Sequence, residues 1–502
     1  MYSKEKMLLI IPPNVSRITE KLKNEGFKAY LIGGCTRDLI IGKRPKDWDV
    51  TTDATPEEIL KIFGEESFYE NKYGTVGVKN EGETDETLRI IEVTTFRLES
   101  AYSDRRRPDA VLFSKKIEDD LQRRDFTINA IAIDIKSVKD NKHEGHIIDL
   151  YGGQSDLSKG LIRTVGKQKD RFNEDALRIL RAVRLATELD FSIEPETEKE
   201  IASSAHLLKN IAKERLRDEF SKIVLSDNPM RGLTLSHKLA ILPYISRDLE
   251  KTSGVEQNRT HKYDVWEHLA RSLQHAADKK LTLEVRLAAL FHDIGKPKSR
   301  RWSEKKKDWT FHGHEVIGEK ITRKNLEELK LPSKTVAVVC KLVRWHMFFS
   351  DTEQITLSAV RRIMANVGKD QIWNLLDVRM CDRIGTGRPK ENPYRLRKYT
   401  SFIEQVMTDP ISVAMLKIDG VEVMKMTNLQ PGPKIGHILH ALLEEVLEDP
   451  QKNTGEYLKN RSLFLAGLTE KELKELGNRG KEKKQSVEEN EIRKIRKKYH
   501  VH

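Results

Sequence analysis

A glycine pair followed by an aspartate pair, both within residues 31–50, constrains the fold more than any other feature of the chain. Gly33 and Gly34 follow a strand-like run and open a short helical pattern, where glycine lets backbone N–H groups approach an anion at a helix start. Asp47 and Asp49 alternate in a strand-like pattern, and side chains two residues apart share one face of a strand. The segment therefore predicts a phosphate-binding turn beside two carboxylates that can hold a cation.

A phosphate-binding turn with paired carboxylates is what a metal-dependent phosphoryl or nucleotidyl transferase requires. In such a reaction one cation activates the attacking hydroxyl and another stabilises the leaving pyrophosphate. Arg37 is close enough in sequence to help neutralise a triphosphate. Glu92, in the β-branched run Leu88–Phe96, is either a third ligand or an exposed strand acid, and the sequence leaves both interpretations open.

The composition allows several cores under a heavily charged surface. Of 502 residues, 38% are hydrophobic and 33% are charged, and the net charge of +12 favours a polyanionic partner, although a merely basic protein would give the same value. No apolar run approaches the ~20 residues of a membrane span, and the N-terminal residues lack a signal-peptide core. Cys35, Cys340 and Cys381 are widely separated, which predicts reduced thiols in a cytoplasmic protein.

The order of the glycine pair, Arg37-Asp38 and Asp47-x-Asp49 resembles the signature of the nucleotidyltransferase superfamily that includes DNA polymerase β. More narrowly, it is similar to the class II branch, which holds tRNA CCA-adding enzymes and bacterial poly(A) polymerases. The resemblance implies Mg²⁺ at Asp47 and Asp49, the substrates CTP and ATP, and the tRNA 3′ end as partner.

A second motif, Arg123-Arg124-Asp125 with Asn129 in its continuation, looks like the Arg-Arg-Asp motif by which that family contacts ribose and phosphates. Guanidinium groups hold phosphate oxygens, and a carboxylate can accept hydrogen bonds from ribose hydroxyls. Without the other motifs, the same residues would indicate only the charged start of a solvated helix.

A third motif contains Asp175 and Arg178 and matches the Glu-Asp-x-x-Arg motif that serves the family as a template for the incoming base. Three residues apart on a helix, the two side chains are expected to be neighbours on one face. A carboxylate accepts from the amino group of cytosine or adenine and an arginine donates to the adjacent ring acceptor, whereas uracil and guanine place a carbonyl there. Arg181 is expected to lie on a solvated basic face.

The segment 94–108 looks like the flexible loop that CC-adding members of the family lack. Its presence favours the use of ATP, and therefore either full CCA addition or addition of the terminal A alone. Poly(A) synthesis stays open, because the same head serves both kinds of enzyme.

Residues 261–385 carry a different constellation, which resembles an HD-type metal-dependent phosphohydrolase domain. The expected metal ligands are His268, His292, Asp293, His314, His346 and Asp382, with His312 a weaker candidate than His314. Imidazole and carboxylate ligands suit Mg, Mn, Ni or Fe. In CCA-adding enzymes that carry such a domain, it is associated with phosphatase and 2′,3′-cyclic phosphodiesterase activity.

Together these features predict an α+β nucleotidyltransferase (polymerase β-like) head followed by all-α neck, HD and tail domains. The expected boundaries are 15–155 for the head, 156–250 for the helical neck, 255–390 for the HD domain, 391–465 for the helical tail and 466–502 for a basic, disordered C-terminus. The predicted function is template-independent addition of CCA, or its terminal A, to tRNA 3′ ends, with a second phosphohydrolase activity. A poly(A) polymerase and an HD phosphohydrolase whose head only binds RNA are the alternatives.

Overall fold

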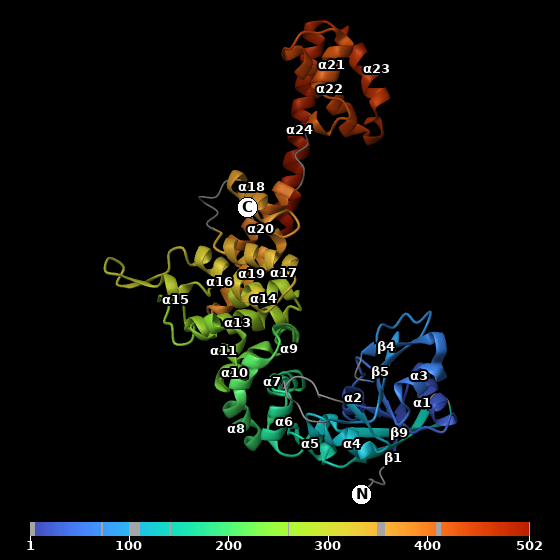
Figure 1. The fold of residues 1–502 in the computed structure, drawn as a ribbon. Helices are drawn as coiled ribbons and strands as arrows, with labels where there is room; N and C mark the ends of the chain where they lie inside the picture. The colour runs from blue at the N-terminus through green and yellow to red at the C-terminus, as the bar shows by residue number, and fades with distance from the viewer. Residues whose placement is uncertain are drawn as a thin grey trace. The chain divides into compact units, whose positions relative to one another are not determined.

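The computed structural model describes residues 6–71, 74–99, 111–139, 142–259, 261–348, 357–407 and 413–500. The chain forms two compact units, one made of residues 1–344 and 377–388 and the other of residues 345–376 and 389–502. Figure 1 labels their helices and strands in chain order. None of the helices in the described ranges combines the length and the apolar character that a bilayer crossing requires.

The first unit begins with an eight-stranded mixed sheet (Figure 1). Its order is β1 (Lys6–Ile10), β10 (Lys142–Asp149), β9 (Ile131–Lys139), β2 (Ala29–Ile32), β3 (Asp49–Thr52), β6 (Ile90–Thr95), β5 (Thr75–Lys79) and β4 (Ser67–Asn71). Neighbouring strands are antiparallel except β3 and β6, which are parallel. The strand-like runs before the glycine pair and around Glu92 are thus confirmed as β2 and β6.

Four helices accompany this sheet: α1 (Pro13–Asn24), α2 (Gly34–Ile40), α3 (Pro56–Phe63) and α4 (Ile117–Gln122). The remaining short elements are η1 (Gly64–Glu66), η2 (Thr127–Asn129) and a separate strand pair, β7 (Arg97–Glu99) and β8 (Val111–Phe113). α1 contacts β2 and β9, and α3 contacts β4 and β5. α3 starts at a capping box in which Thr55 and Glu58 satisfy each other's backbone N–H groups.

Helices dominate the rest of the first unit. The neck comprises α5 (Gly153–Lys159), β11 (Leu161–Ile162), α6 (Gln168–Glu174), α7 (Leu177–Leu189), β12 (Ser192–Ile193), α8 (Pro195–Ser204), η3 (Ala205–Asn210), α9 (Lys213–Leu225), α10 (Pro229–Lys238), α11 (Leu242–Ile245) and α12 (Arg247–Glu250). α7 packs against both α9 and α10 and buries Ile179, Val183 and Ala186 completely. This packing holds the start of α7, where the third motif lies, against α9.

The segment after the neck is also helical, as predicted, apart from one small hairpin. Its elements are α13 (Val265–Asp278), α14 (Leu283–Phe291), α15 (Lys296–Ser299), the hairpin β13 (Arg301–Ser303) and β14 (Asp308–Thr310), α16 (His314–Glu328), α17 (Ser333–Trp345), α18 (Leu357–Val367) and α19 (Ile372–Gly385). α13 packs along α14, and α15 contacts α16.

The second unit has its own apolar core. Its C-terminal elements are α20 (Tyr394–Met407), η4 (Val413–Met415), α21 (Gly420–Thr427), α22 (Pro433–Glu448), η5 (Pro450–Lys452), α23 (Gly455–Ala466) and α24 (Glu470–Lys498). Ile438, Leu442, Leu458 and Leu465 are fully buried in this core, and α21, α22 and α23 contact one another there.

The expected disorder of residues 466–502 is wrong for α24. A capping box of Thr469 and Glu472 starts the helix, and Leu473 is buried in the core. Gly477 and Gly480 then face α22 so closely that a Cβ on Gly480 would lie 2.1 Å from the backbone oxygen of His440. Glycine is ordinarily unfavourable inside a helix, but here its missing side chain allows the two helices to pack, which composition alone does not reveal.

Candidate active site and candidate metal centre

The three predicted carboxylates of the head lie on or just before the neighbouring strands β3 and β6. Asp49 is the first residue of β3 and pairs in register with Glu92 of β6. Buried and open positions alternate along β6, and Glu92 lies on the open side. The prediction that Asp47 lies within the strand is wrong, because Asp47 occupies an exposed bend before β3. Trp48, between the two acids, is buried.

The glycine turn meets these acids directly. Gly33 has φ +81°, a backbone conformation that residues with a side chain rarely adopt. A Cβ added there would lie 3.0 Å from Asp49 Oδ2 and 3.2 Å from Arg124 Nη1, and one at Gly34 would lie 3.9 Å from Asp47 Oδ1. A side chain at Gly33 would therefore fill the space between the carboxylate of Asp49 and the guanidinium of Arg124.

Burial and neighbouring acids raise the pKa of two of these acids, Asp49 and Glu92. Burial raises the pKa of Asp49 to about 7, Glu92 and Asp47 act in the same direction, and Arg124 opposes them. Burial also raises the pKa of Glu92, helped by the charges of Glu70 and Asp47. A divalent cation would remove this repulsion, and Mg²⁺ is commonly held by one or two carboxylates together with substrate phosphates. The three acids therefore fit a magnesium site.

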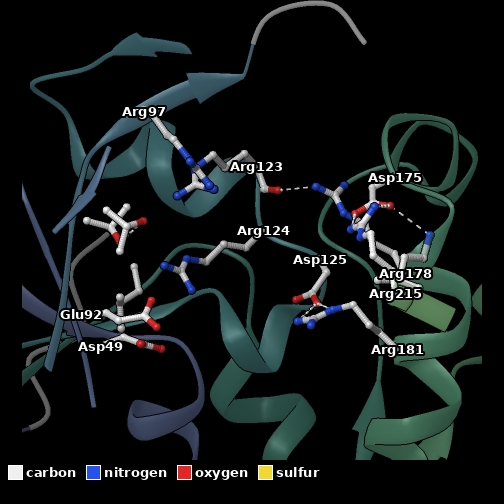
Figure 2. A pocket seen from close by; sticks show the side chains of 14 residues that line it. Asp49, Glu92, Arg97, Arg123, Arg124, Asp125, Asp175, Arg178, Arg181 and Arg215 are labelled. Atoms are coloured by element: carbon white, nitrogen blue, oxygen red, sulfur yellow. Dashed lines mark hydrogen bonds and ion pairs between the residues drawn. The ribbon is translucent and has the colours of Figure 1, made fainter. Parts of the chain in front are cut away.

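A pocket of about 380 Å³ extends from these acids to the neck. Figure 2 shows Asp49 and Glu92 at one end of the pocket and Asp175, Arg178 and Arg215 at the other. The charged side chains that line it are Asp49, Glu92, Arg97, Arg123, Arg124, Asp125, Asp175, Arg178, Arg181 and Arg215. The excess of arginine over acid suits a polyphosphate, and the volume lies within the range of small-ligand sites.

The arginines of the second motif are held from behind by an acid that the sequence interpretation missed. Asp120 of α4 is completely buried and pairs with Arg123 at 2.5 Å and with Arg124 at 3.3 Å. Burial alone would raise the pKa of Asp120, but the two guanidinium groups outweigh it and lower the pKa. Asp120 precedes the two arginines by three and four residues, and this helix-like spacing was the signal in the sequence, although α4 ends at Gln122.

The carboxylate of Asp125 links the head to the neck. Its Oδ1 accepts the Phe126 N–H at 2.8 Å, and its Oδ2 pairs with Arg181 Nη2 at 2.6 Å. Asn129 donates to Asp125 at 3.3 Å and accepts from Arg37 Nη1 at 3.1 Å. The expectation that Arg181 lies on a solvated face is therefore wrong, because α7 turns this side chain toward a buried carboxylate.

The third motif is built differently from the predicted single helix face. Asp175 has extended backbone angles and ends α6, whereas Arg178 lies in the first turn of α7. Both oxygens of Asp175 accept from Arg215 of α9, at 3.2 and 2.6 Å. Arg178 is buried and donates to Glu174 at 2.6 Å and to the Arg123 backbone oxygen at 2.9 Å. Both side chains line the pocket, but each is oriented by another part of the chain.

The start of the predicted loop contributes Thr94 and Arg97 to the pocket. Residues 100–108 of that loop lie outside the described residues. The sequence interpretation therefore missed Arg97 and Arg215 as pocket residues. Arg215 lies in a neck helix, and nothing in its local sequence indicates that it faces Asp175.

A second group of candidate ligands lies in the helical segment that follows the neck. His268 of α13, His292 and Asp293 after α14, and Asp382 of α19 are all buried, and one ligand atom from each lies within 4.8 Å of the others. His268 Nε2 lies 2.8 Å from His292 Nε2 and 3.1 Å from Asp293 Oδ2. Two ring nitrogens facing each other beside two carboxylates have the donor set that a divalent metal ion prefers.

Further contacts orient this cluster. His292 Nδ1 faces the Ala289 backbone oxygen at 2.8 Å, which leaves its Nε2 directed at the cluster. His314 Nε2 lies 3.1 Å from Asp293 Oδ1, so the structure brings this predicted ligand to the same acid. Lys296 Nζ lies 2.5 Å from Asp293 Oδ2, a contact that the sequence interpretation missed.

Two predicted histidines lie outside the four-residue group of His268, His292, Asp293 and Asp382. His346 is buried and belongs to the second unit. Its role as a ligand stays a prediction. His312 is exposed and lies in the turn before α16.

Comparisons with known proteins match three segments of the chain to sequence families. Residues 29–163 match the poly A polymerase head domain, residues 190–252 match a probable RNA and SrmB binding site of polymerase A, and residues 265–385 match the HD domain. The resemblance drawn from the motifs is thereby confirmed for the head and for the HD segment.

Two curated relatives match most of the chain. The CCA-adding enzyme of Ligilactobacillus salivarius is 31% identical over 86% of this chain and 91% of its own, and that of Geobacillus thermodenitrificans is 32% identical over 88% and 93%. The crystal structure of the Bacillus stearothermophilus CCA-adding enzyme in complex with CTP is also similar. It has 27% identity and a TM-score of 0.59, and the match covers 90% of this chain and 98% of that one.

Proposed function

Because the chain belongs to the family of CCA-adding enzymes, we propose that it adds CCA, or its terminal A, to tRNA 3′ ends from CTP and ATP without a nucleic acid template. The observation that carries the proposal is one pocket lined both by Asp49 and Glu92 and by the base-template residues Asp175 and Arg178. A pocket that presents a cation site and a base-recognition site together can align an α-phosphate with an RNA terminus.

Asp47, Asp49 and Glu92 are the residues that would hold Mg²⁺, which when bound supplies activation of the 3′ hydroxyl and neutralisation of the pyrophosphate. Arg123 and Arg124, held by the buried Asp120, present their guanidinium groups to the triphosphate. Because Asp120 anchors both groups, little side-chain entropy is lost when a nucleotide binds.

Base selection rests on acceptor positions of Asp175. A carboxylate has about four of them, and Arg215 and the Leu177 N–H occupy three. The remaining one can accept from the amino group that cytosine and adenine share. Arg215 is a positioning residue, because it fixes the carboxylate without itself reading the base.

The direct test offers purified protein tRNA that ends at the discriminator, at C or at CC, with each nucleoside triphosphate. Full CCA addition extends all three substrates with CTP and ATP and stops at the terminal A. Extension only of the CC-ended tRNA by ATP would limit the enzyme to A addition. A ladder of many adenylates would instead identify a poly(A) polymerase, and no extension of any substrate would leave the head as an RNA-binding module.

The buried cluster favours a second activity, hydrolysis of phosphate esters at RNA ends. His268, His292, Asp293 and Asp382 would hold a divalent ion, which when bound lowers the pKa of a water molecule and polarises the phosphate. His314 would join them through Asp293. The test is hydrolysis of the cyclic phosphate on an oligonucleotide that ends in a 2′,3′-cyclic phosphate. Assays with Mg²⁺, Mn²⁺, Ni²⁺ and Fe²⁺ in turn check both the activity and the metal.

A cytoplasmic location agrees with these substrates. The three cysteines are buried and none of them forms a disulfide, which is ordinary for a protein in a reducing compartment. Retention of activity in fractionated cytosol would support this location.

A further inference from the structure

The hairpin β13–β14 carries an aromatic pair that no core requires. Trp302 and Trp309 face each other across the two strands, with ring centroids 5.2 Å apart in an edge-to-face arrangement. Trp302 is 49% exposed, whereas Trp309 is covered by the guanidinium of Arg300 at 3.7 Å. The exposed indole ring is therefore held in place by its neighbours but remains accessible to a ligand.

Basic residues outnumber acidic ones near this indole in the sequence. The hairpin and its approach contain Lys298, Arg300, Arg301, Lys305, Lys306 and Lys307, against the two acids Glu304 and Asp308. The lysines of the turn are exposed, and the nearby Asp308 is occupied by the Arg259 N–H at 3.1 Å. A rigid aromatic surface beside clustered positive charge is the combination that binds single-stranded nucleic acid, since every base has a face that can stack.

Both ends of the hairpin are fixed at the buried cluster. Lys296, at the start of α15, contacts Asp293 Oδ2, and His314, at the start of α16, contacts Asp293 Oδ1. The Phe311 backbone oxygen also meets His314 Nδ1 at 2.6 Å. The chain thus leaves the cluster at one Asp293 partner, forms the hairpin, and returns to another, and Figure 1 shows this arm extending beyond α15.

We propose that the hairpin β13–β14 is a docking arm for the single-stranded 3′ end of an RNA that the buried cluster hydrolyses. A terminal base stacks on Trp302, and Lys305, Lys306 and Lys307 contact backbone phosphates. The role in catalysis rests on the proposed phosphohydrolase function, whereas RNA binding by the arm does not.

Two measurements separate the arm from the cluster. The first is fluorescence anisotropy of a labelled RNA hexamer with a 2′,3′-cyclic phosphate, bound to the full-length protein without added metal. Trp302→Ala is expected to weaken binding roughly tenfold, and Trp302→Phe to restore most of it. Replacing the three lysines by serine should lower the slope of log K against log salt by roughly 0.7 for each phosphate that a lysine neutralises in the wild type. Trp373→Ala, at an indole 37% exposed on α19, is the matched control and should bind as wild type.

The second measurement compares hydrolysis of the hexamer with that of bis-p-nitrophenyl phosphate, together with nucleotide addition to tRNA. Trp302→Ala should raise KM for the hexamer roughly tenfold and leave both other activities unchanged.

Unchanged hexamer binding in Trp302→Ala would overturn the proposal and leave the patch to a protein partner. If Trp302→Ala lost as much activity on the small ester as on the hexamer, the hairpin would only support the structure of the cluster. If it lost as much nucleotide addition, the hairpin would belong to the transferase. Either result would overturn the proposal. If the wild type hydrolyses neither ester, the phosphohydrolase function fails and the docking role fails with it, even where the binding loss persists.

Discussion

The two candidate metal regions of this protein are built on opposite plans. In the head, Asp47 is exposed, Asp49 and Glu92 face an open pocket, and arginines form much of the wall. In the second region, His268, His292, Asp293 and Asp382 are buried within 4.8 Å of one another. Among the residues that the structure describes, only this second region gathers three or more potential ligands so tightly. As proposed, the head site would need the phosphates of its substrate to complete the coordination of its metal ion, whereas the side chains of the cluster would supply most ligands by themselves.

The electrostatics follow the same division. The pKa of Asp49 is raised to about 7 because burial and neighbouring acids disfavour its charge. Burial also acts to raise the pKa of Asp293, but Lys296 and His292 outweigh it and hold the pKa well below its usual range. The head is thus arranged to receive a cation with its substrate, while the acid of the cluster is already charged and paired.

The largest expected effect separates the two regions outright. Asp49→Asn should reduce nucleotide addition roughly 10³-fold or more, because several kcal/mol of charge stabilisation would be lost and each 1.36 kcal/mol is a factor of ten. Hydrolysis by the cluster should be unchanged. Steady-state addition of ATP to CC-ended tRNA measures this loss. Asp53→Asn, which alters an acid that accepts the Lys28 N–H outside the pocket, should retain activity.

The reciprocal change tests the second region. Asp293→Asn should abolish phosphate-ester hydrolysis and spare nucleotide addition. It should also remove the metal-dependent rise in Tm, which in the wild type corresponds to about 2.7 kcal/mol at a metal concentration a hundred times Kd. Thermal melting with and without metal provides the readout, with the exposed Asp278→Asn as control. Loss of both activities by a folded variant would show that the two regions are not independent.

A smaller effect is expected on base selection within the head. Asp175→Asn should narrow the preference for ATP and CTP over GTP and UTP by roughly 5- to 150-fold, the equivalent of about 1–3 kcal/mol for one buried hydrogen bond. The ratio of kcat/KM values measures it. Fidelity equal to that of the wild type would mean that this carboxylate does not read the base.

The smallest effect concerns the link between head and neck. Arg181→Met should lower stability by about 1–3 kcal/mol near neutral pH, because the buried carboxylate of Asp125 loses its ion-pair partner. Burial acts to raise the pKa of Asp125, but Arg181 and Arg178 outweigh it, so the pKa of Asp125 is lowered in the folded protein. The stability that this ion pair contributes is therefore fully present above the usual carboxylate pKa, and it is lost as the pH falls through the pKa of Asp125 in the folded state.

Thermal melting at a series of pH values should therefore show the Arg181→Met deficit shrinking below about pH 4. The control is Arg217→Met, whose partner Asp218 is largely exposed, and it should cost under about 0.5 kcal/mol. A deficit that stays constant down to low pH would assign the role of Arg181 to packing.

The sequence by itself determined the chemistry-bearing segments of this protein. The glycine turn, the strands β2 and β6 and the acids of the head were recognisable from the pattern of neighbouring residues. The four histidine and aspartate residues of the cluster were recognisable from the resemblance of their segment to an HD domain. The family followed from the order of those motifs along the chain.

Only the tertiary structure decided which distant groups meet. Arg215 reaches Asp175 because α9 packs against α7, which follows Asp175 directly, and Arg181 of α7 reaches Asp125 of the head. α24 packs along α22 because Gly477 and Gly480 allow the two helices to approach. Each of these contacts joins residues far apart in sequence. Such contacts depend on how helices pack in three dimensions, and the periodicity of a single segment carries no information about its partner.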